Sequence, residues 1–376
     1  MKTLNVTWDG IQDPTGYLFS FAKSLSCAVK HSPWPEYAED IVATSGFAFR
    51  MWVTPDLCPS ATSIWEFRMQ KPWVENGGFT AEYVERLWGV EAEQEEARRR
   101  EAVETVKRSI DRGIPAVSWD IGVPEWGLIT GYDDAAATFA TFSITGEGDM
   151  PYTLLGKREL PILSVLTLCG RTGKPEEAVL RDTMHLAVSH LGGEEWCENA
   201  KGLDAYPALI RQFETDFRPD LSWNQEYFLG TYGALKYYAW RYFDKMGQTA
   251  LAAGYKRIYE AWLEAFQTKT GQDCTREEVR ERIAALLKSA EREERLLAGF
   301  GQTAAAPSAI FTMFNNADVR FQAVRGGDGE EIPVTHGSYG TLMESRDRSL
   351  RQAVFHSYYS SYRQFSNTLA AAYEGH

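Results

Sequence analysis

The feature that most constrains the fold is a change of hydrophobic pattern along the chain. After a long charged stretch at 91–112 and the break Gly113-Ile114-Pro115, three short strand-like runs follow at 116–120, 126–131 and 137–144. The preceding segment 17–30 instead repeats its apolar residues at helical spacing. Helices followed by closely spaced strands are typical of an α+β fold, because an alternating βαβ fold would interleave the two.

The rest of the chain predicts a domain organisation in three parts. Residues 1–169 form the α+β domain, and 170–298 read as a helical domain with helices at 176–190, 206–217, 223–246, 249–269 and 276–298. A third part, 299–376, follows a run of small residues; its glycine-rich 325–331 segment predicts a hairpin turn, and 347–373 predicts a final helix. We therefore expect a helical bundle packed on an α+β domain, with a small helical and hairpin tail.

Charge and hydropathy limit the partners of the chain. The net charge is −13 over 376 residues, which repels phosphate backbones and anionic lipid, so we expect neither nucleic acid nor membrane as a partner. The start of the chain lacks the pattern of a secretory signal, and the longest apolar stretch, 160–169, is too short to span a bilayer. Five scattered cysteines without a Cys-x-x-Cys pair are typical of free thiols. We expect a cytoplasmic protein.

The most informative motif lies at 117–134. It reads as a strand, a polar break, Glu125-Trp126, an apolar strand and then Gly131-Tyr132-Asp133-Asp134. This pattern resembles papain-like proteins of the bacteriocin-processing type and the N-terminal domain of butirosin biosynthesis protein H. Those families carry a histidine, an aromatic residue, a short apolar run and Gly-Tyr-Asp-Asp. The resemblance covers about 10–295 and implies a papain-like fold in which the histidine activates a cysteine for acyl transfer or amide hydrolysis.

The three positions that match the catalytic residues of this family all differ from its pattern. Glu125 stands at the histidine position, and a carboxylate cannot supply the two-nitrogen relay of an imidazole. The helix that should open with the cysteine is expected to begin near Tyr17, with no thiol there, and Ser143 falls where an Asp or Asn would orient the histidine. Cys27 lies inside that helix as an expected core residue. We therefore expect a catalytically degenerate domain.

The leading hypothesis is that this domain binds a small molecule or peptide in the former active-site cleft. The residues expected to contact the ligand are Arg50, Trp52, Asp120, Glu125 and Trp126, which would suit a small cationic or zwitterionic molecule. An alternative keeps the chemistry of an acyltransferase or amide hydrolase and uses Cys58 as the nucleophile. Cys58 sits in a proline-rich loop, and the Arg50 guanidinium is the kind of group that stabilises a nearby thiolate.

The C-terminal tail resembles a different family. The stretches 310–318, 328–331, 335–339, 342–348 and 367–370 are similar to oligoendopeptidase F, a zinc peptidase, over about 292–376. The resemblance implies a metallopeptidase, or part of one, as a third hypothesis. Such an enzyme needs His-Glu-x-x-His, and these 376 residues contain no His-Glu pair. We expect no metal site.

Two further expectations follow from the sequence. Gly-x-Gly-x-x-Gly and Walker patterns are missing, so no cofactor is expected. A fragment of a larger helical protein should also expose apolar helix faces, which predicts self-association through the tail or docking against 170–298.

Overall fold

The computed structural model describes residues 1–63, 65–87, 89, 92–195, 199–316, 321–326 and 329–374. The chain forms two compact units, Met1–Gly301 and Gln302–His376. The segments 1–169 and 170–298, which were expected to form two domains, both lie within the first unit. Each unit is described by itself below.

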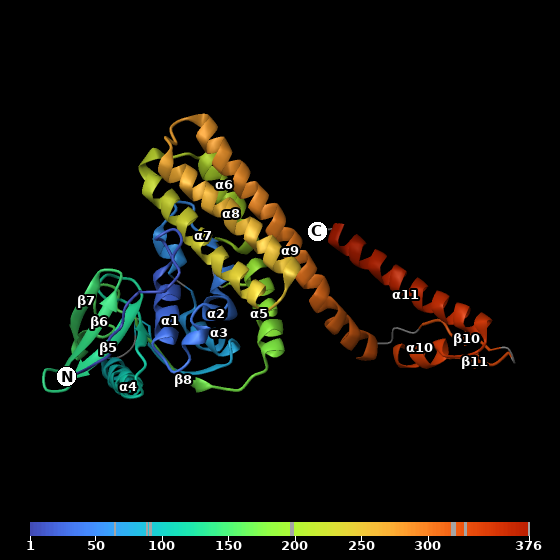
Figure 1. Ribbon diagram of the computed structural model, residues 1–376, viewed down its shortest axis with the longest axis horizontal. Helices are drawn as coiled ribbons and strands as arrows, with labels where there is room; N and C mark the ends of the chain where they lie inside the picture. The colour runs from blue at the N-terminus through green and yellow to red at the C-terminus, as the bar shows by residue number, and fades with distance from the viewer. Residues whose placement is uncertain are drawn as a thin grey trace. The chain divides into compact units, whose positions relative to one another are not determined.

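The first unit is built on an antiparallel sheet with the strand order β3-β8-β4-β5-β6-β7 (Figure 1). A short N-terminal strand, β1 (Lys2–Thr3), pairs with β5 beyond the end of β4. Val117 lies opposite both Leu128 and Leu166, which fixes the register of the central strands. The other strands of this sheet are β3 (Phe79–Arg86), β4 (Ala116–Ser118), β5 (Gly127–Asp133), β6 (Thr138–Ser143), β7 (Gly146–Pro151) and β8 (Leu163–Arg171).

The sheet is covered by helices on both faces. Successive side chains of a strand point to opposite faces, and neighbours such as Ala116 and Val117 accordingly enter two different hydrophobic clusters. One face packs against α4 (Ala92–Asp111), and the other packs against α1 (Ser20–Lys30). This burial of both faces explains why the central strands read as nearly continuous apolar runs.

Helices make up most of the remainder of this unit, on the α1 side of the sheet (Figure 1). Helix α7 packs along α8, and its N-terminal half also contacts the segment before α1. A second, two-stranded sheet joins β2 (Trp52–Val53) to β9 (Ala200–Lys201). The helices are α2 (Asp40–Thr44), α3 (Gln70–Asn76), α5 (Glu176–Leu191), α6 (Ala205–Glu214), α7 (Ser222–Lys245), α8 (Thr249–Gly271) and α9 (Glu277–Asn316), of which only the part up to Gly301 belongs to this unit.

A buried ion pair ties two of these helices together. Lys236 of α7 and Glu294 of α9 have fully buried side chains, and the Lys236 Nζ lies 2.7 Å from Glu294 Oε1. Tyr206 of α6 donates a 2.6 Å hydrogen bond to the other oxygen of Glu294, and Trp262 of α8 donates to the Tyr206 hydroxyl. Four helices therefore converge on one buried carboxylate.

The second unit has a small core of its own. A hairpin of β10 (Val324–Arg325) and β11 (Glu331–Ile332) precedes α10 (His336–Met343) and α11 (Arg348–Glu374). Phe321, Val324, Val334 and Val354 are buried together, and Phe321 and Tyr339 both stack on Tyr358. On the outer side of α11, Phe355 and Tyr359 are about half exposed.

The observed elements agree closely with the expected ones in some places and depart from them in others. The strands at 116–144 and the helices α5 to α8 begin and end within a few residues of the expected bounds. Helix α1 begins at Ser20, three residues after the expected start, because Phe19 is in an extended conformation. Helix α9 continues well beyond 298, and strands β3, β7 and β8 were not foreseen.

Replacing Lys236 tests the buried ion pair. Lys236→Met leaves the Glu294 carboxylate buried without its counter-ion, so we expect a loss of about 3–5 kcal/mol in the free energy of unfolding. Adding Glu294→Gln should recover part of this loss, because the amide is neutral and still accepts from Tyr206. Urea unfolding followed by circular dichroism measures both effects. Arg282→Met breaks the exposed pair with Glu264 and should cost less than about 1 kcal/mol; equal losses at the two sites would contradict the interpretation.

Candidate functional site

A tight loop between β4 and β5 presents Glu125 to the start of α1. Asp120 and Gly122 both have positive φ, +59° and +78°, which turns the chain sharply after β4. The Glu125 carbonyl accepts a 3.1 Å hydrogen bond from the Ile121 amide, which closes the loop. This hydrogen bond fixes the backbone position from which the Glu125 side chain projects.

Two serines bind the Glu125 carboxylate. Ser20, the first residue of α1, donates a short hydrogen bond to Glu125 Oε2, and Ser63 donates to the same oxygen at 2.9 Å. The Ser20 oxygen also accepts from the Trp126 amide at 3.2 Å. Ser20 is 5% exposed and Ser63 is 1% exposed. The carboxylate thus joins the helix start, the strand loop and the turn that follows η3 (Pro59–Thr62).

Burial dominates the electrostatics of this cluster. It raises the pKa of Glu125, although the hydrogen bonds from Ser20 and Ser63 act in the opposite direction. Tyr227 of α7 lies beside the cluster, where its hydroxyl shares a 2.7 Å hydrogen bond with Thr62 Oγ1. Burial, together with the Glu125 charge, raises the pKa of Tyr227 to about 12.

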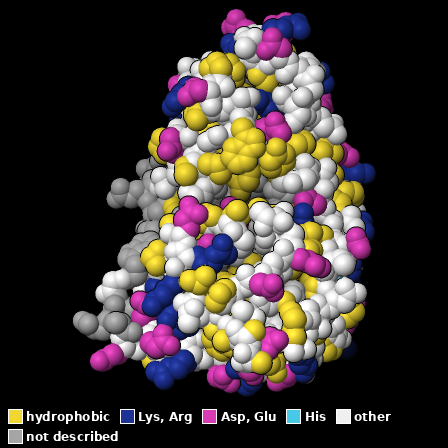
Figure 2. Space-filling view, turned by 90° about the vertical axis from the view of Figure 1, so that its left-hand side faces the viewer, with side chains coloured by type: hydrophobic (Ala, Val, Ile, Leu, Met, Phe, Trp, Pro, Cys, Tyr) yellow, Lys and Arg dark blue, Asp and Glu magenta, His cyan; other side chains and the backbone are white. Residues whose placement is uncertain are grey.

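Aromatic side chains border the cluster on the side of α7. Trp223 is 55% exposed and stacks on Tyr227 at a centroid distance of 5.4 Å. Tyr17 meets Tyr227 edge-on at 6.0 Å and Phe266 at 5.7 Å, and its hydroxyl donates to Glu226 at 2.6 Å. We call Tyr17, Trp223, Tyr227 and Phe266 the aromatic ledge. Figure 2 shows one face of the molecule, on which hydrophobic side chains gather over the upper part with a hollow below them.

The structure places three of the expected ligand-binding residues inside the core. Trp126 is fully buried, stacks on Trp65 at 5.1 Å, and donates its indole N–H to the Ser63 carbonyl. Trp52 is 4% exposed in β2. Arg50 is equally buried and forms an ion pair with Glu195 at 2.7 Å. These side chains support the cluster from behind and do not line an open cleft.

The remaining expected positions are spread around Glu125. Asp120 is 2% exposed, accepts from the Leu160 amide, and has a pKa raised by burial. Ser143 bonds to Thr145, and Tyr17 reaches Glu226 and not Glu125. The Cys58 sulfur lies 2.9 Å from Ser60 Oγ, while the side-chain hydrogen bonds of Glu125 within the described residues go to Ser20 and Ser63. Of the expected residues, only Trp126 joins the Glu125 cluster directly.

Sequence reasoning missed Ser20, Ser63 and Tyr227. Ser20 was hidden because the helix was expected to begin at Tyr17, which places Ser20 inside its first turn. Hydrophobic periodicity cannot reveal that Phe19 is extended, because residues 17–19 are compatible both with the first turn of a helix and with the segment that precedes one. Cys27 matches its expected role: it is buried, donates to the Thr7 carbonyl, and has a pKa raised to about 12 by burial.

Comparison with known proteins finds similarity to oligopeptidases over part of the chain. Oligoendopeptidase F, plasmid, of Lactococcus lactis subsp. cremoris is 36% identical over 115 residues, which are 31% of this chain and 19% of that protein. Group B oligopeptidase PepB of Streptococcus agalactiae serotype III (strain NEM316) is 41% identical over 80 residues, or 21% and 13%. Oligopeptidase PepF of Bacillus subtilis (strain 168) is 36% identical over 85 residues, or 23% and 13%.

These matches cover a fifth or less of each relative named here. No known protein-family profile matches the chain. Within the described residues, no group of three or more His, Cys, Asp or Glu side chains is arranged to hold a metal ion. The described helices include none with the length and apolar character needed to cross a bilayer.

The raised pKa of Glu125 has a measurable consequence for stability. The folded protein binds more protons than the unfolded chain between the unfolded and the folded pKa of this group, so the free energy of unfolding falls as pH rises through that interval. Glu125→Gln cannot ionise but keeps an oxygen that accepts from Ser20 and Ser63. We expect its stability relative to the wild type to increase from about pH 4 to pH 7.

Chemical unfolding of both proteins across this pH range measures the difference. Glu281→Gln, at an exposed position of α9, is the control for removing one carboxylate. A difference between Glu125→Gln and the wild type that stays constant with pH would contradict the assignment.

Proposed function

We propose that the first unit is a papain-like scaffold without cysteine chemistry that binds a small molecule or peptide beside Glu125. The observation that carries this proposal is the Ser20–Glu125 hydrogen bond at the start of α1. The family that 117–134 resembles keeps a thiol at such a helix start and an imidazole opposite it. In the scaffold that we propose, the Ser20 hydroxyl and the Glu125 carboxylate stand in for these two groups, although the sequence pattern matched the thiol position to Tyr17.

The contacts of Ser20 argue against its use as a nucleophile. Its hydroxyl donates to Glu125 and accepts from the Trp126 amide, so the oxygen is already engaged in both roles. Attack on a substrate also needs access, and Ser20 is 5% exposed. The Glu125 oxygen that accepts from Ser20 accepts from Ser63 as well, which favours a structural lock over a proton relay.

The aromatic ledge is the surface that we assign to the ligand. Trp223 offers a half-exposed indole, and Tyr227 connects that indole to the Glu125 cluster through Thr62. Rings with one apolar face and a polar handle suit small molecules and peptide side chains. The nearby Asn224 is held by the Leu57 carbonyl, which ties the ledge to the Cys58 loop.

A protein labelled with 5-fluorotryptophan tests the ligand site. The Trp223 signal, assigned by its loss in Trp223→Phe, should shift saturably in ¹⁹F NMR with at least one member of a panel of N-acetyl amino-acid amides. Tyr227→Ala should weaken that binding by about fivefold or more, because it removes the ring on which Trp223 stacks. The absence of a saturable Trp223 shift across the panel would contradict the ligand site.

The same samples test the absence of acyl chemistry. Intact-mass analysis after incubation with aminoacyl thioesters and activated amides should give no stable acyl adduct. Cys58→Ser and Ser20→Ala should behave as the wild type does. An adduct lost in Cys58→Ser would instead support an acyltransferase or amide hydrolase that uses Cys58.

A second proposal concerns the relation to peptidases. We infer that the stretch similar to oligoendopeptidase F and its namesakes is a peptidase-related helical module. The identities of 36–41% over 80–115 residues support this inference. The described residues contain no cluster of three or more His, Cys, Asp or Glu side chains that could hold a metal ion, so the proposed module includes no metal site within them.

Metal analysis and a peptide assay test the second proposal. The purified chain, incubated with equimolar zinc and then desalted, should retain less than about a tenth of an equivalent, because a catalytic zinc site needs three protein ligands. A quenched-fluorescence heptapeptide should not be cleaved. Stoichiometric zinc with cleavage that a chelator abolishes would overturn our assignment and support a metallopeptidase.

A further inference from the structure

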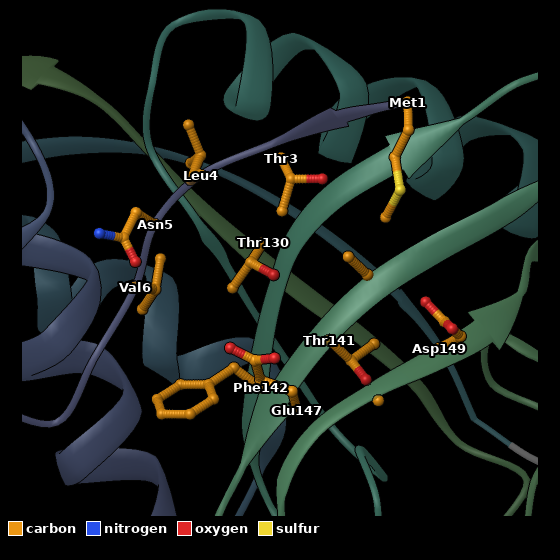
Figure 3. A pocket seen from close by; sticks show the side chains of 12 residues that line it. Met1, Thr3, Leu4, Asn5, Val6, Thr130, Thr141, Phe142, Glu147 and Asp149 are labelled. Atoms are coloured by element: carbon orange, nitrogen blue, oxygen red, sulfur yellow. The ribbon is translucent and has the colours of Figure 1, made fainter.

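A second hollow lies on the sheet, away from the Glu125 cluster. It measures about 550 Å³ and lies between the N-terminal segment and strands β5, β6 and β7 (Figure 3). Cavities of this size hold small organic molecules or parts of peptides. We call it the β-groove. The side chains that share this face of the sheet determine which kind of ligand it can bind.

The floor and one wall of the β-groove are apolar. Ala140 and Phe142 lie two residues apart on β6 and so point to the same face. Trp8 packs against Phe142 at a centroid distance of 4.6 Å, which fixes the ring. Leu4 and Val6 of the N-terminal segment form the facing wall (Figure 3). An apolar body could therefore be buried here.

Two carboxylates border the same groove. Glu147 lies opposite Phe142 in the register of β6 and β7, and Asp149 lies opposite Ala140, so both share the face of the apolar floor. Both are exposed, and neither has an ion pair or side-chain hydrogen bond within the described part of the chain. Met1 also lines the groove, and its terminal ammonium group lies 3.6 Å from Asp133. Lys2 and Lys23, on the segments beside it, are paired with Asp111 and Asp13.

Thr130 supplies a hydroxyl group that can still form hydrogen bonds with a ligand. It lines the β-groove, is 5% exposed, and its hydroxyl has no hydrogen-bond partner among the described residues. Because the side chain is almost wholly enclosed and its hydroxyl opens into the groove, a hydrogen-bonding group of an occupant can reach it. This observation is independent of the carboxylates and points to an occupant that bears a hydrogen-bonding group.

We propose that the β-groove binds a small cation that consists of an ammonium group on an apolar body. The ammonium would lie between Glu147 and Asp149, the apolar part would pack on Phe142, and Thr130 would bond to a polar group of the ligand. The site is separate from the aromatic ledge and does not depend on the function proposed there.

Titration calorimetry at low ionic strength tests the charge requirement. The probes are 2-phenylethylamine and lysyl-phenylalanine amide, with 3-phenylpropionate as the anion of similar size. We expect both amines to bind at least tenfold more tightly than the anion. Tighter binding of the dipeptide would indicate a peptide as the natural source of the ammonium group, and equal binding would indicate a small amine. Binding of the anion as tight as that of the amines, or no binding of either amine, would overturn the proposal.

Variants locate the site within the chain. Glu147→Gln with Asp149→Asn should weaken amine binding by about tenfold or more, because the two neutral amides remove both charge contacts with the ammonium group. The control, Glu177→Gln with Glu281→Gln, removes two exposed carboxylates elsewhere and should change binding by less than about twofold. If both double variants weaken binding equally, the amines respond only to the net charge of the protein, and the proposed site is refuted.

Thr130→Val separates binding from folding. It replaces a partnerless hydroxyl with a methyl of the same shape, so we expect an unchanged or higher unfolding temperature together with severalfold weaker binding of lysyl-phenylalanine amide. Unchanged binding would exclude Thr130 from the site. Trp223→Ala, which alters the aromatic ledge, should leave amine binding unchanged. If this variant no longer binds the amines, they bind at the ledge, and the proposal for the β-groove is refuted.

Discussion

The hydrogen bonds that converge on Glu125 hold together elements that are far apart in the sequence. The start of α1, the turn after η3 and the loop before β5 each contribute one group to the same carboxylate or its neighbour. A buried carboxylate is unfavourable unless it is hydrogen-bonded. The loop, the helix start and the turn must therefore be in place together. The stacked Trp65 and Trp126 pack directly behind this point, so the core depends on the same arrangement.

The two proposed ligand surfaces differ in the way the fold builds them. The aromatic ledge belongs to α7 and to the segment before α1, and its polar groups already satisfy one another. The β-groove belongs to the sheet and the N-terminal segment, and the side chains of Glu147, Asp149 and Thr130 that border it have no such partners within the described residues. One surface offers aromatic contact area, and the other offers uncompensated charge. The two should select ligands of different chemistry.

The sequence predicted the elements whose pattern is local. Strands at 116–144 and helices α5 to α8 could be recognised because alternation and helical spacing persist over several residues. Strand β8 could not be recognised, because a short apolar run fits a buried strand and a buried helix equally well. The alternation in β3 shifts its phase where Tyr83 and Val84 are adjacent apolar residues, which leaves too short a regular pattern to recognise. Its charged residues Glu82 and Glu85 suit a strand at the edge of the sheet.

The candidate site could be predicted only in part for the same reason. Glu125 was found from its neighbours in the sequence, but its partners Ser20 and Ser63 lie more than 60 residues away, and serine carries little signal by itself. Arg50 was expected in a cleft because its charge was considered alone. Its partner Glu195 is 145 residues away, and the pair neutralises Arg50 within the core. Pairing between residues far apart in the sequence therefore determines which charged side chains can still contact a ligand.

The convergence of four helices on Glu294 has an evolutionary consequence. Lys236 and Glu294 neutralise each other at a fully buried position. A mutation that removes only one of them leaves a buried charge without a counter-ion and lowers the stability of the fold. Drift at these two codons should be coupled. Related chains are expected to keep both residues or to have exchanged both for an uncharged pair, and the intermediate genotypes should be short-lived.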